Sequence, residues 1–171
     1  NGGNSQPFTG EVDVRIPSPK GVPFDQVPEL SLPQVTGQVL QGIEKKYDFI
    51  YTGSVKADRK VTDLLNRFIQ KDLSTRTLLI LSRDYKYIAN EYRNFSNIIF
   101  RGPVSKQEVA HYLSESRFAI NYIPDREPYN KQTSTKFLEY QQFNVPVITT
   151  DYPWLGEFEY KYGGNFFKIN T

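Results

Sequence analysis

The sequence predicts an α/β fold in which helices cover both faces of a Rossmann-like parallel sheet. From residue 48 onward, short apolar runs alternate with segments of helical periodicity that are 10 to 12 residues long. The short runs are apolar on both faces, which is typical of strands buried in a parallel sheet. The regular strand–helix order favours βα units over an antiparallel arrangement.

The expected elements follow one another closely along the chain. The capping box Ser-Lys-Gln-Glu at 105–108 begins one helix. The helix over 60–71 has the cleanest apolar face, formed by Val61, Leu64, Leu65, Phe68 and Ile69. Further helices are expected over 84–93 and 134–143, and strands over 48–52, 77–82, 97–100, 117–123, 145–150 and 165–169.

The amino-terminal part has a different composition. Residues 1–33 are rich in proline and glycine, and within them "EVDVRI" (11–16) alternates at period two, which predicts a strand. Residues 34–46 have apolar positions at helical spacing. We therefore expect a lead-in over 1–33 and one domain over 34–171.

Composition excludes several classes of function. The net charge of +2, from 21 basic and 19 acidic residues, gives no reason to expect nucleic acid as a partner. No apolar run approaches the roughly 18 residues that a membrane span needs, so no membrane insertion is expected. The chain has no cysteine and a single histidine, His111, so we expect no disulfide and no Cys-based or His-cluster metal site. It also lacks methionine, which suggests a processed product or an excised piece.

Ligands of parallel sheets bind beyond the carboxyl ends of the strands, so the loops there are the candidates. Loop 53–60, "GSVKADRK", places a glycine after a buried strand and Arg59 and Lys60 at a helix start. Backbone amides and a cation in that position could hold a phosphate. The alternative is a solvated helix start, since the spacing matches no phosphate-loop fingerprint.

Loop 124–134 is the second candidate because it is long for a βα connection. Ser134 or Thr133 can cap the helix that follows, leaving free amides directed at the cleft. Glu139 lies about a turn and a half into that helix and is either a ligand-binding carboxylate or a surface residue. His111 is expected to be solvated and Trp154 to pack in a loop.

Four segments together resemble a known family: "YDFIYTGSVKADRKVTDLL", "TLLILS", "NIIFRGPVSKQEVAHYLSESRFAINYIP" and "STKFLEYQQFNVPVITTD". They are similar to the carboxyl-terminal, donor-binding half of GT-B glycosyltransferases of family 4 (group 1). The stretch "IPSPKGVPF" (16–24) also looks like the segment leading into that half. The resemblance covers roughly residues 12–169 and implies one Rossmann-like half of a GT-B fold.

The resemblance also implies site residues. Glu139 matches the glutamate that binds the ribose hydroxyls of the donor. Arg59 and Lys136 match catalytic cations that neutralise the diphosphate. The remaining donor-binding positions implied by the resemblance are Gly53, Ser54, Lys60, Arg101, Gly102, Pro103, Ser134 and Thr135.

The implied function is retaining transfer of a sugar from a UDP- or GDP-linked donor to a saccharide or lipid-linked acceptor. Surface polysaccharide or glycan biosynthesis is the expected context. The expected location is the cytoplasm, with the full-length protein peripheral at the inner membrane. The resemblance implies no cofactor and no metal, because fixed cations and helix-end amides stabilise the leaving diphosphate. The acceptor would bind a missing amino-terminal half, so this chain alone is expected to be inactive.

Two other functions stay open at this stage. One is a flavodoxin-like regulatory or interaction module without sugar-nucleotide chemistry. It is motivated by two departures from the family pattern, Lys131 in place of a glutamate and Ser54 in place of an arginine. The other is half of a nucleotide-sugar epimerase, which would need histidine and acid residues at the cleft. Nucleotide binding that depends on Glu139 would separate the donor half from the interaction module.

Overall fold

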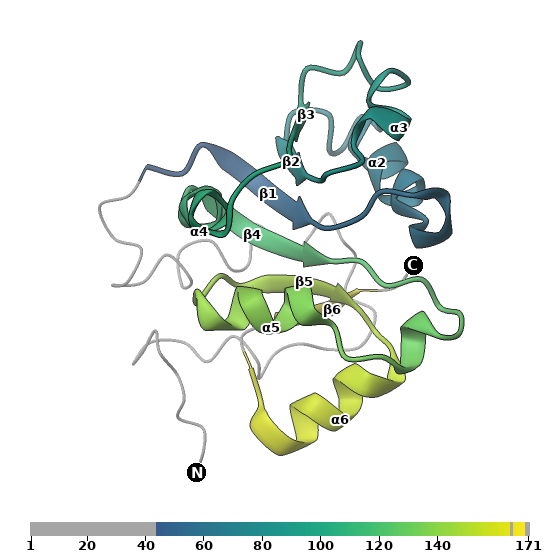
Figure 1. Cartoon of the computed structure of the whole chain (residues 1–171), viewed down its shortest axis with the longest axis vertical. Coiled ribbons are helices and arrows are strands. Elements are labelled where there is room, and N and C mark those ends of the chain that lie inside the picture. The colour runs from purple at the N-terminus through teal and green to yellow at the C-terminus, as the bar shows by residue number, and fades with distance from the viewer. Residues whose placement is uncertain (1–43, 165, 170–171) are drawn as a thin grey trace.

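The computed structural model describes residues 44–164 and 166–169. Its centre is a sheet of parallel strands in the order β3-β2-β1-β4-β5-β6 (Figure 1). The strands are β1 (Tyr47–Thr52), β2 (Leu78–Leu81), β3 (Ile98–Arg101), β4 (Ser116–Asn121), β5 (Val147–Thr150) and β6 (Phe166–Ile169). The predicted Rossmann-like α/β fold is therefore confirmed.

The chain order explains where a ligand could bind. From β1 the strands run outward in one direction through β2 to β3, and in the other through β4 and β5 to β6. The register between β1 and β4 pairs Phe49 with Phe118 and Ile50 with Ala119. The strand order reverses at this pair, and such a switch point leaves a crevice beyond the carboxyl ends of the strands.

Helices connect the strands. They are α2 (Val61–Phe68), α3 (Lys86–Ala89), α4 (Lys106–Ser114), α5 (Thr135–Gln142) and α6 (Pro153–Tyr162), with short 3-10 turns η4 (Ala57–Arg59) and η5 (Tyr129–Lys131) in the loops. The predicted capping box is present: Ser105 Oγ accepts from the Glu108 amide at 3.1 Å, and Glu108 accepts from the Ser105 amide at 2.6 Å. The reciprocal bonds fix the first residue of α4.

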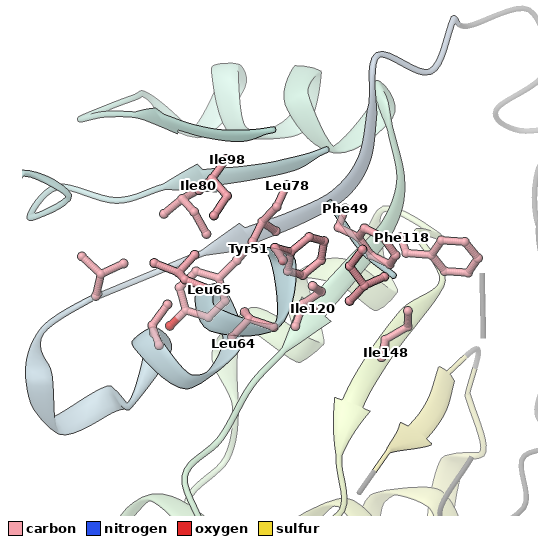
Figure 2. Close-up of a cluster of buried hydrophobic side chains, with 14 of the residues drawn as sticks. Phe49, Tyr51, Leu64, Leu65, Leu78, Ile80, Ile98, Phe118, Ile120 and Ile148 are labelled. Carbon is pink, nitrogen blue, oxygen red and sulfur yellow. The ribbon is translucent and has the colours of Figure 1, made fainter. Parts of the chain in front are cut away.

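Side chains of successive strand residues enter two cores on opposite faces of the sheet. On β1, Phe49 and Tyr51 face the first core, which also holds Leu64, Leu65 and Phe68 of α2. Figure 2 shows this cluster between α2 and the strands. Ile50 faces the second core, which holds Leu113 of α4, Phe137 and Tyr140 of α5 and Leu155 of α6. Burial on both faces explains the continuously apolar strands.

Several predicted boundaries differ from the structure. The helix α2 ends at Phe68, before the predicted 71, and only Lys86–Ala89 of the predicted helix 84–93 is α-helical, with turns on either side. Helix α6 was not predicted, and Trp154 lies in it and not in a loop. The strand predicted over 11–16 and most of the segment 34–46 lie outside the described residues. No helix among the described residues has the length and hydropathy that a membrane crossing needs.

Candidate functional site

A cavity of about 700 Å³ lies beyond the carboxyl ends of β1, β2 and β4. Its walls come from the loop 52–59, the turn 81–84, Pro103 and Val104, Val109 of α4, and the segment that runs from Ile123 to the first turns of α5. The crevice expected from the strand order is thus present, and the amino end of α5 reaches it.

Ser134 fixes the start of α5 and ties it to the sheet. Its Oγ accepts from the Phe137 amide at 3.2 Å and donates to Asn121 Oδ1 at 2.7 Å. Asn121 lies at the end of β4 and is fully buried. First-turn amides of a helix have no acceptor within the helix, so the rigidly held end of α5 presents amides to the cavity.

Lys136 extends from α5 across the end of β1. Its Nζ lies 5.0 Å from the ring centroid of Tyr51, and a Cβ placed on Gly53 would come within 3.1 Å of its Cε. Burial, and then the nearby positive charge of Arg59, lower the pKa of Lys136 to about 8. The absence of a side chain at Gly53 leaves space for this lysine.

Arg59 enters the cavity from η4 and is held by the opposite loop. Its Cζ lies 4.4 Å from the ring centroid of Tyr129, a cation–π distance. The Tyr129 hydroxyl donates to Asp58 Oδ2 at 2.5 Å, and Arg126 Nη2 donates to the Asp58 carbonyl at 2.8 Å. The hydrogen bond from Tyr129 lowers the pKa of Asp58. The loops 53–60 and 124–134 are therefore linked through Asp58 and Tyr129.

Asp84 is a structural acid in the cavity wall. Its carboxylate accepts from Ser82 Oγ at 2.5 Å, from Ser54 Oγ at 2.9 Å and from the Val55 amide at 3.1 Å. Burial alone would raise the pKa of Asp84, but these hydrogen bonds outweigh it and hold the pKa below its usual range. Asp84 thus joins the turn after β2 to the loop after β1.

Glu139 is half-buried and lines the cavity one turn beyond Lys136. Among the described residues, the Glu139 carboxylate forms no hydrogen bond and no ion pair. Its carboxylate is therefore available to a donor group on a ligand, in contrast to that of Asp84.

The structure brings most of the predicted site residues together. Arg59, Lys136, Gly53, Ser54, Pro103, Ser134, Thr135 and Glu139 all line the cavity.

Three predicted residues lie outside the cavity lining. Lys60 is exposed and is the N-cap residue that precedes α2. Arg101 is also exposed, and its Nη1 donates to the Phe100 carbonyl at 3.0 Å. Gly102 is packed against the backbone, because a Cβ there would lie 2.0 Å from the Ser82 carbonyl oxygen. The close packing against Ser82 is a structural reason for a glycine at this position.

The sequence did not single out Lys56, Arg83 and Tyr129, which also line the cavity. Lys56 and Arg83 lie in loops that were candidates because each follows a strand. The Tyr129 hydroxyl donates to Asp58, a residue 71 positions away in sequence, and this bond helps to hold Tyr129 at the cavity. Such a long-range contact leaves no local signal in the sequence.

Sequence comparisons relate part of the chain to a different family. Residues 1–63 match the family model of the metalloenzyme superfamily. The 2,3-bisphosphoglycerate-independent phosphoglycerate mutase of Moorella thermoacetica is 35% identical over 100 residues, covering 50% of this chain and 19% of that protein. The corresponding mutase of Pseudomonas fluorescens Pf0-1 is 41% identical over 59 residues, covering 34% of this chain and 12% of the relative. The chain thus spans about a fifth or less of these relatives.

Two solved structures have a related arrangement. One is E. coli heptosyltransferase WaaC with ADP, with a TM-score of 0.48 and 12% identity over 86% of this chain and 42% of that chain. The other is the Methanocaldococcus jannaschii UDP-GlcNAc 2-epimerase in complex with UDP-GlcNAc and UDP, with a TM-score of 0.48 and 13% identity over 85% of this chain and 42% of that chain. Similarity at this level does not establish membership of glycosyltransferase family 4.

The matches correct the predicted function. The expected donor-binding half of a retaining glycosyltransferase, with an interaction module as its alternative, is contradicted by the metalloenzyme family model and the phosphoglycerate mutase relatives. The resemblance had been drawn from strand-end motifs, which Rossmann-like domains of different activity share.

The same matches correct the expectation that no metal is needed. That expectation rested on the resemblance, in which fixed cations and helix-end amides take the place of a metal, and the scarcity of cysteine and histidine fitted it. Carboxylates can also bind metals. Within residues 44–164 and 166–169, however, no group of three or more His, Cys, Asp or Glu side chains is placed to hold a metal ion. Asp84 is committed to Ser54, Ser82 and Val55. The described cavity therefore does not fit a metal, and most of the matched segment lies outside the described residues.

Proposed function

We propose that the cavity binds the phosphorylated part of a small molecule, and that the chain is part of an enzyme acting on such a molecule. The observation that supports this best is the convergence of Arg59 and Lys136 on one cavity from two different loops. Neither cation has a carboxylate within 4.0 Å among the described residues. Half-buried cations without a counter-ion are costly unless a ligand supplies the negative charge.

The chemistry of the two cations suits a phosphate. The guanidinium of Arg59 can donate two parallel hydrogen bonds to one phosphoryl group, and the ammonium of Lys136 acts as a compact positive charge. The first-turn amides of α5 add further donors, and the partial positive charge at that end of the helix favours an anion. Lys56 and Arg83, at the exposed rim, add to the attraction.

The cavity also has space for the remainder of a ligand. Leu81, Pro103, Val104, Val109 and Ile123 form an apolar part of its lining. The free carboxylate of Glu139 can accept hydrogen bonds from hydroxyl groups. A nucleotide sugar is one ligand with these features, and the phosphoglycerates named for the mutase relatives are smaller ligands of the same phosphorylated class.

Calorimetric titration of the chain with pyrophosphate, 3-phosphoglycerate and UDP tests the proposal. At least one should bind, and Lys136→Gln or Arg59→Gln should weaken its binding about tenfold to a hundredfold, the value of one charged hydrogen bond. Lys60→Gln is a matched control, because it removes an adjacent but exposed charge outside the cavity. Absence of binding at millimolar concentration, or an equal effect of Lys60→Gln, would reject the proposal.

A second candidate is metal-dependent phosphoglycerate mutase activity of the protein that contains this chain. The match of residues 1–63 to the metalloenzyme superfamily favours it. The assay is conversion of one phosphoglycerate isomer into the other, before and after removal of divalent metal with a chelator. Activity that is lost on chelation and restored by added metal would support this candidate. Activity unaffected by the chelator would exclude its metal dependence.

A further inference from the structure

The amine of Lys136 differs from most lysines in its surroundings. It is half-buried in the cavity, and no hydrogen bond or ion pair to it is recorded within the described part of the chain. Its Nζ lies over the ring face of Tyr51, 5.0 Å from the centroid. Lys46 and Lys131, in contrast, form ion pairs with Glu115 at 2.7 Å and Glu127 at 2.5 Å. Among the described residues, therefore, Lys136 has no hydrogen-bond or ion-pair partner that would hold its proton.

The surroundings increase the neutral fraction of the Lys136 amine. Burial, and then the charge of Arg59, lower the pKa of Lys136 from 10.5 to about 8. Near pH 8, about half of such amines are neutral, roughly a hundredfold more than for an ordinary lysine. A neutral amine is a nucleophile toward carbonyl carbon, which is the usual reason for a desolvated lysine beside another cation in a carbonyl-binding site.

We propose that Lys136 forms an imine with phosphorylated aldehydes that enter this cavity, their phosphate being held by Arg59 and the amino end of α5. The proposal rests on the proposed function and names the ligand class: a small aldehyde that carries a phosphate ester. The cavity of about 700 Å³ is large enough for a ligand of this kind.

The step is a condensation that needs no further reactant. The Lys136 nitrogen attacks the carbonyl carbon, and a carbon–nitrogen bond forms as the carbonyl π bond breaks. The two protons of the amine leave with the carbonyl oxygen as one water molecule, giving a carbon–nitrogen double bond. No electron acceptor or donor is required, and addition of water reverses the reaction.

Pyridoxal 5′-phosphate is a suitable probe, because it carries both an aldehyde and a phosphate ester. The chain is incubated with it near pH 8, reduced with borohydride to fix the imine, and digested for mass-spectrometric mapping. Lys45 is an internal comparison, since burial, and then the charge of Arg117, lower its pKa to about 8 as well. Its Nζ donates to the Ser114 carbonyl at 2.6 Å, and it does not line the cavity.

We expect Lys136 to be labelled at least tenfold faster than Lys45 and the exposed lysines. Pyridoxal, which lacks the phosphate, should lose this preference, and pyrophosphate should slow the labelling. Equal labelling of Lys45 and Lys136, or labelling spread over exposed lysines, would overturn the proposal. If pyrophosphate binds by calorimetry but Lys136 stays unlabelled, the imine proposal alone fails. If pyrophosphate and the other phosphorylated ligands do not bind, the proposed function fails as well.

Discussion

The hydroxyl of Tyr140 accepts a hydrogen bond from the Thr52 amide at 3.0 Å, deep between α5 and the end of β1. It also lies 3.3 Å from the Ile120 carbonyl of β4, to which it donates. Tyr140 is fully buried, so these bonds are shielded from water. One side chain thus fixes α5, which carries Lys136 and Glu139, relative to the strands that form the floor of the cavity.

Removal of this hydroxyl should destabilise the domain. Tyr140→Phe leaves the Thr52 amide without its side-chain acceptor, and an unsatisfied buried donor costs about 1–3 kcal/mol. The free energy of unfolding, measured with urea, should fall by that amount. Tyr160→Phe is the matched control because Tyr160 is 91% exposed, and its effect should be close to zero. Equal stabilities of the two variants would contradict the role assigned to Tyr140.

Gly102 should tolerate no side chain. Its φ is +148°, and a Cβ there would lie 2.0 Å from the Ser82 carbonyl oxygen, so Gly102→Ala requires the backbone to move. We expect a loss of more than about 1 kcal/mol in the free energy of unfolding. Gly156→Ala in α6 has nothing within 4 Å of the added Cβ and should be neutral or stabilising. Near-identical effects of the two substitutions would refute the packing argument.

Binding of a phosphorylated ligand should weaken as the pH rises through about 8. The reason is that Lys136, with a pKa of about 8, attracts an anion only when it is protonated. Between pH 7 and pH 9 the protonated fraction falls about tenfold, and the association constant should fall similarly. In Lys136→Arg the cation persists at both pH values, so calorimetry should find this pH dependence largely lost. An unchanged dependence in the variant would assign it to another group.

The described domain should bind its ligand without the preceding residues. Among the described residues, those that line the cavity lie between Thr52 and Glu139. The metalloenzyme match over residues 1–63 includes the central strand β1, and the boundary at residue 34 stays a prediction. A fragment of residues 44–171 should bind pyrophosphate within about threefold of the whole chain by calorimetry. Loss of binding would show that earlier residues complete the site.

The parts of the fold that were predicted correctly depend on local patterns. Short runs such as Leu78–Leu81 are apolar throughout and lie between loop signals, so burial on both faces could be inferred. The capping box at Ser105 likewise depends only on residues three apart. Such features need no knowledge of tertiary contacts.

The missed helix α6 depends on distant contacts. Trp154 was expected in a loop, yet Pro153 is the first residue of α6, a position where proline is favourable. The rings of Trp154 and Phe158 lie 5.7 and 5.1 Å from that of Phe137 in α5, and this packing stabilises α6. The segment 84–93 differs from its prediction in the opposite direction. A helix was predicted over its whole length, but only Lys86–Ala89 is helical and turns lie on either side.

For the site, the sequence could predict which loops meet but not which charges stay unpaired. Gly53, Arg59 and Ser134 follow from strand ends and helix starts. That Asp84 is bound by Ser54 while Glu139 remains free depends on side-chain placement. The activity could not be predicted from these sequence patterns, because loops at the same position serve different chemistry in different Rossmann-like proteins.

A crystal structure of the chain with pyrophosphate would test the central claim most directly. We predict that one phosphoryl group lies within hydrogen-bonding distance of both Lys136 Nζ and the Arg59 guanidinium, at the amino end of α5. An anion bound only outside the cavity, for example against the exposed Lys60, would contradict the account.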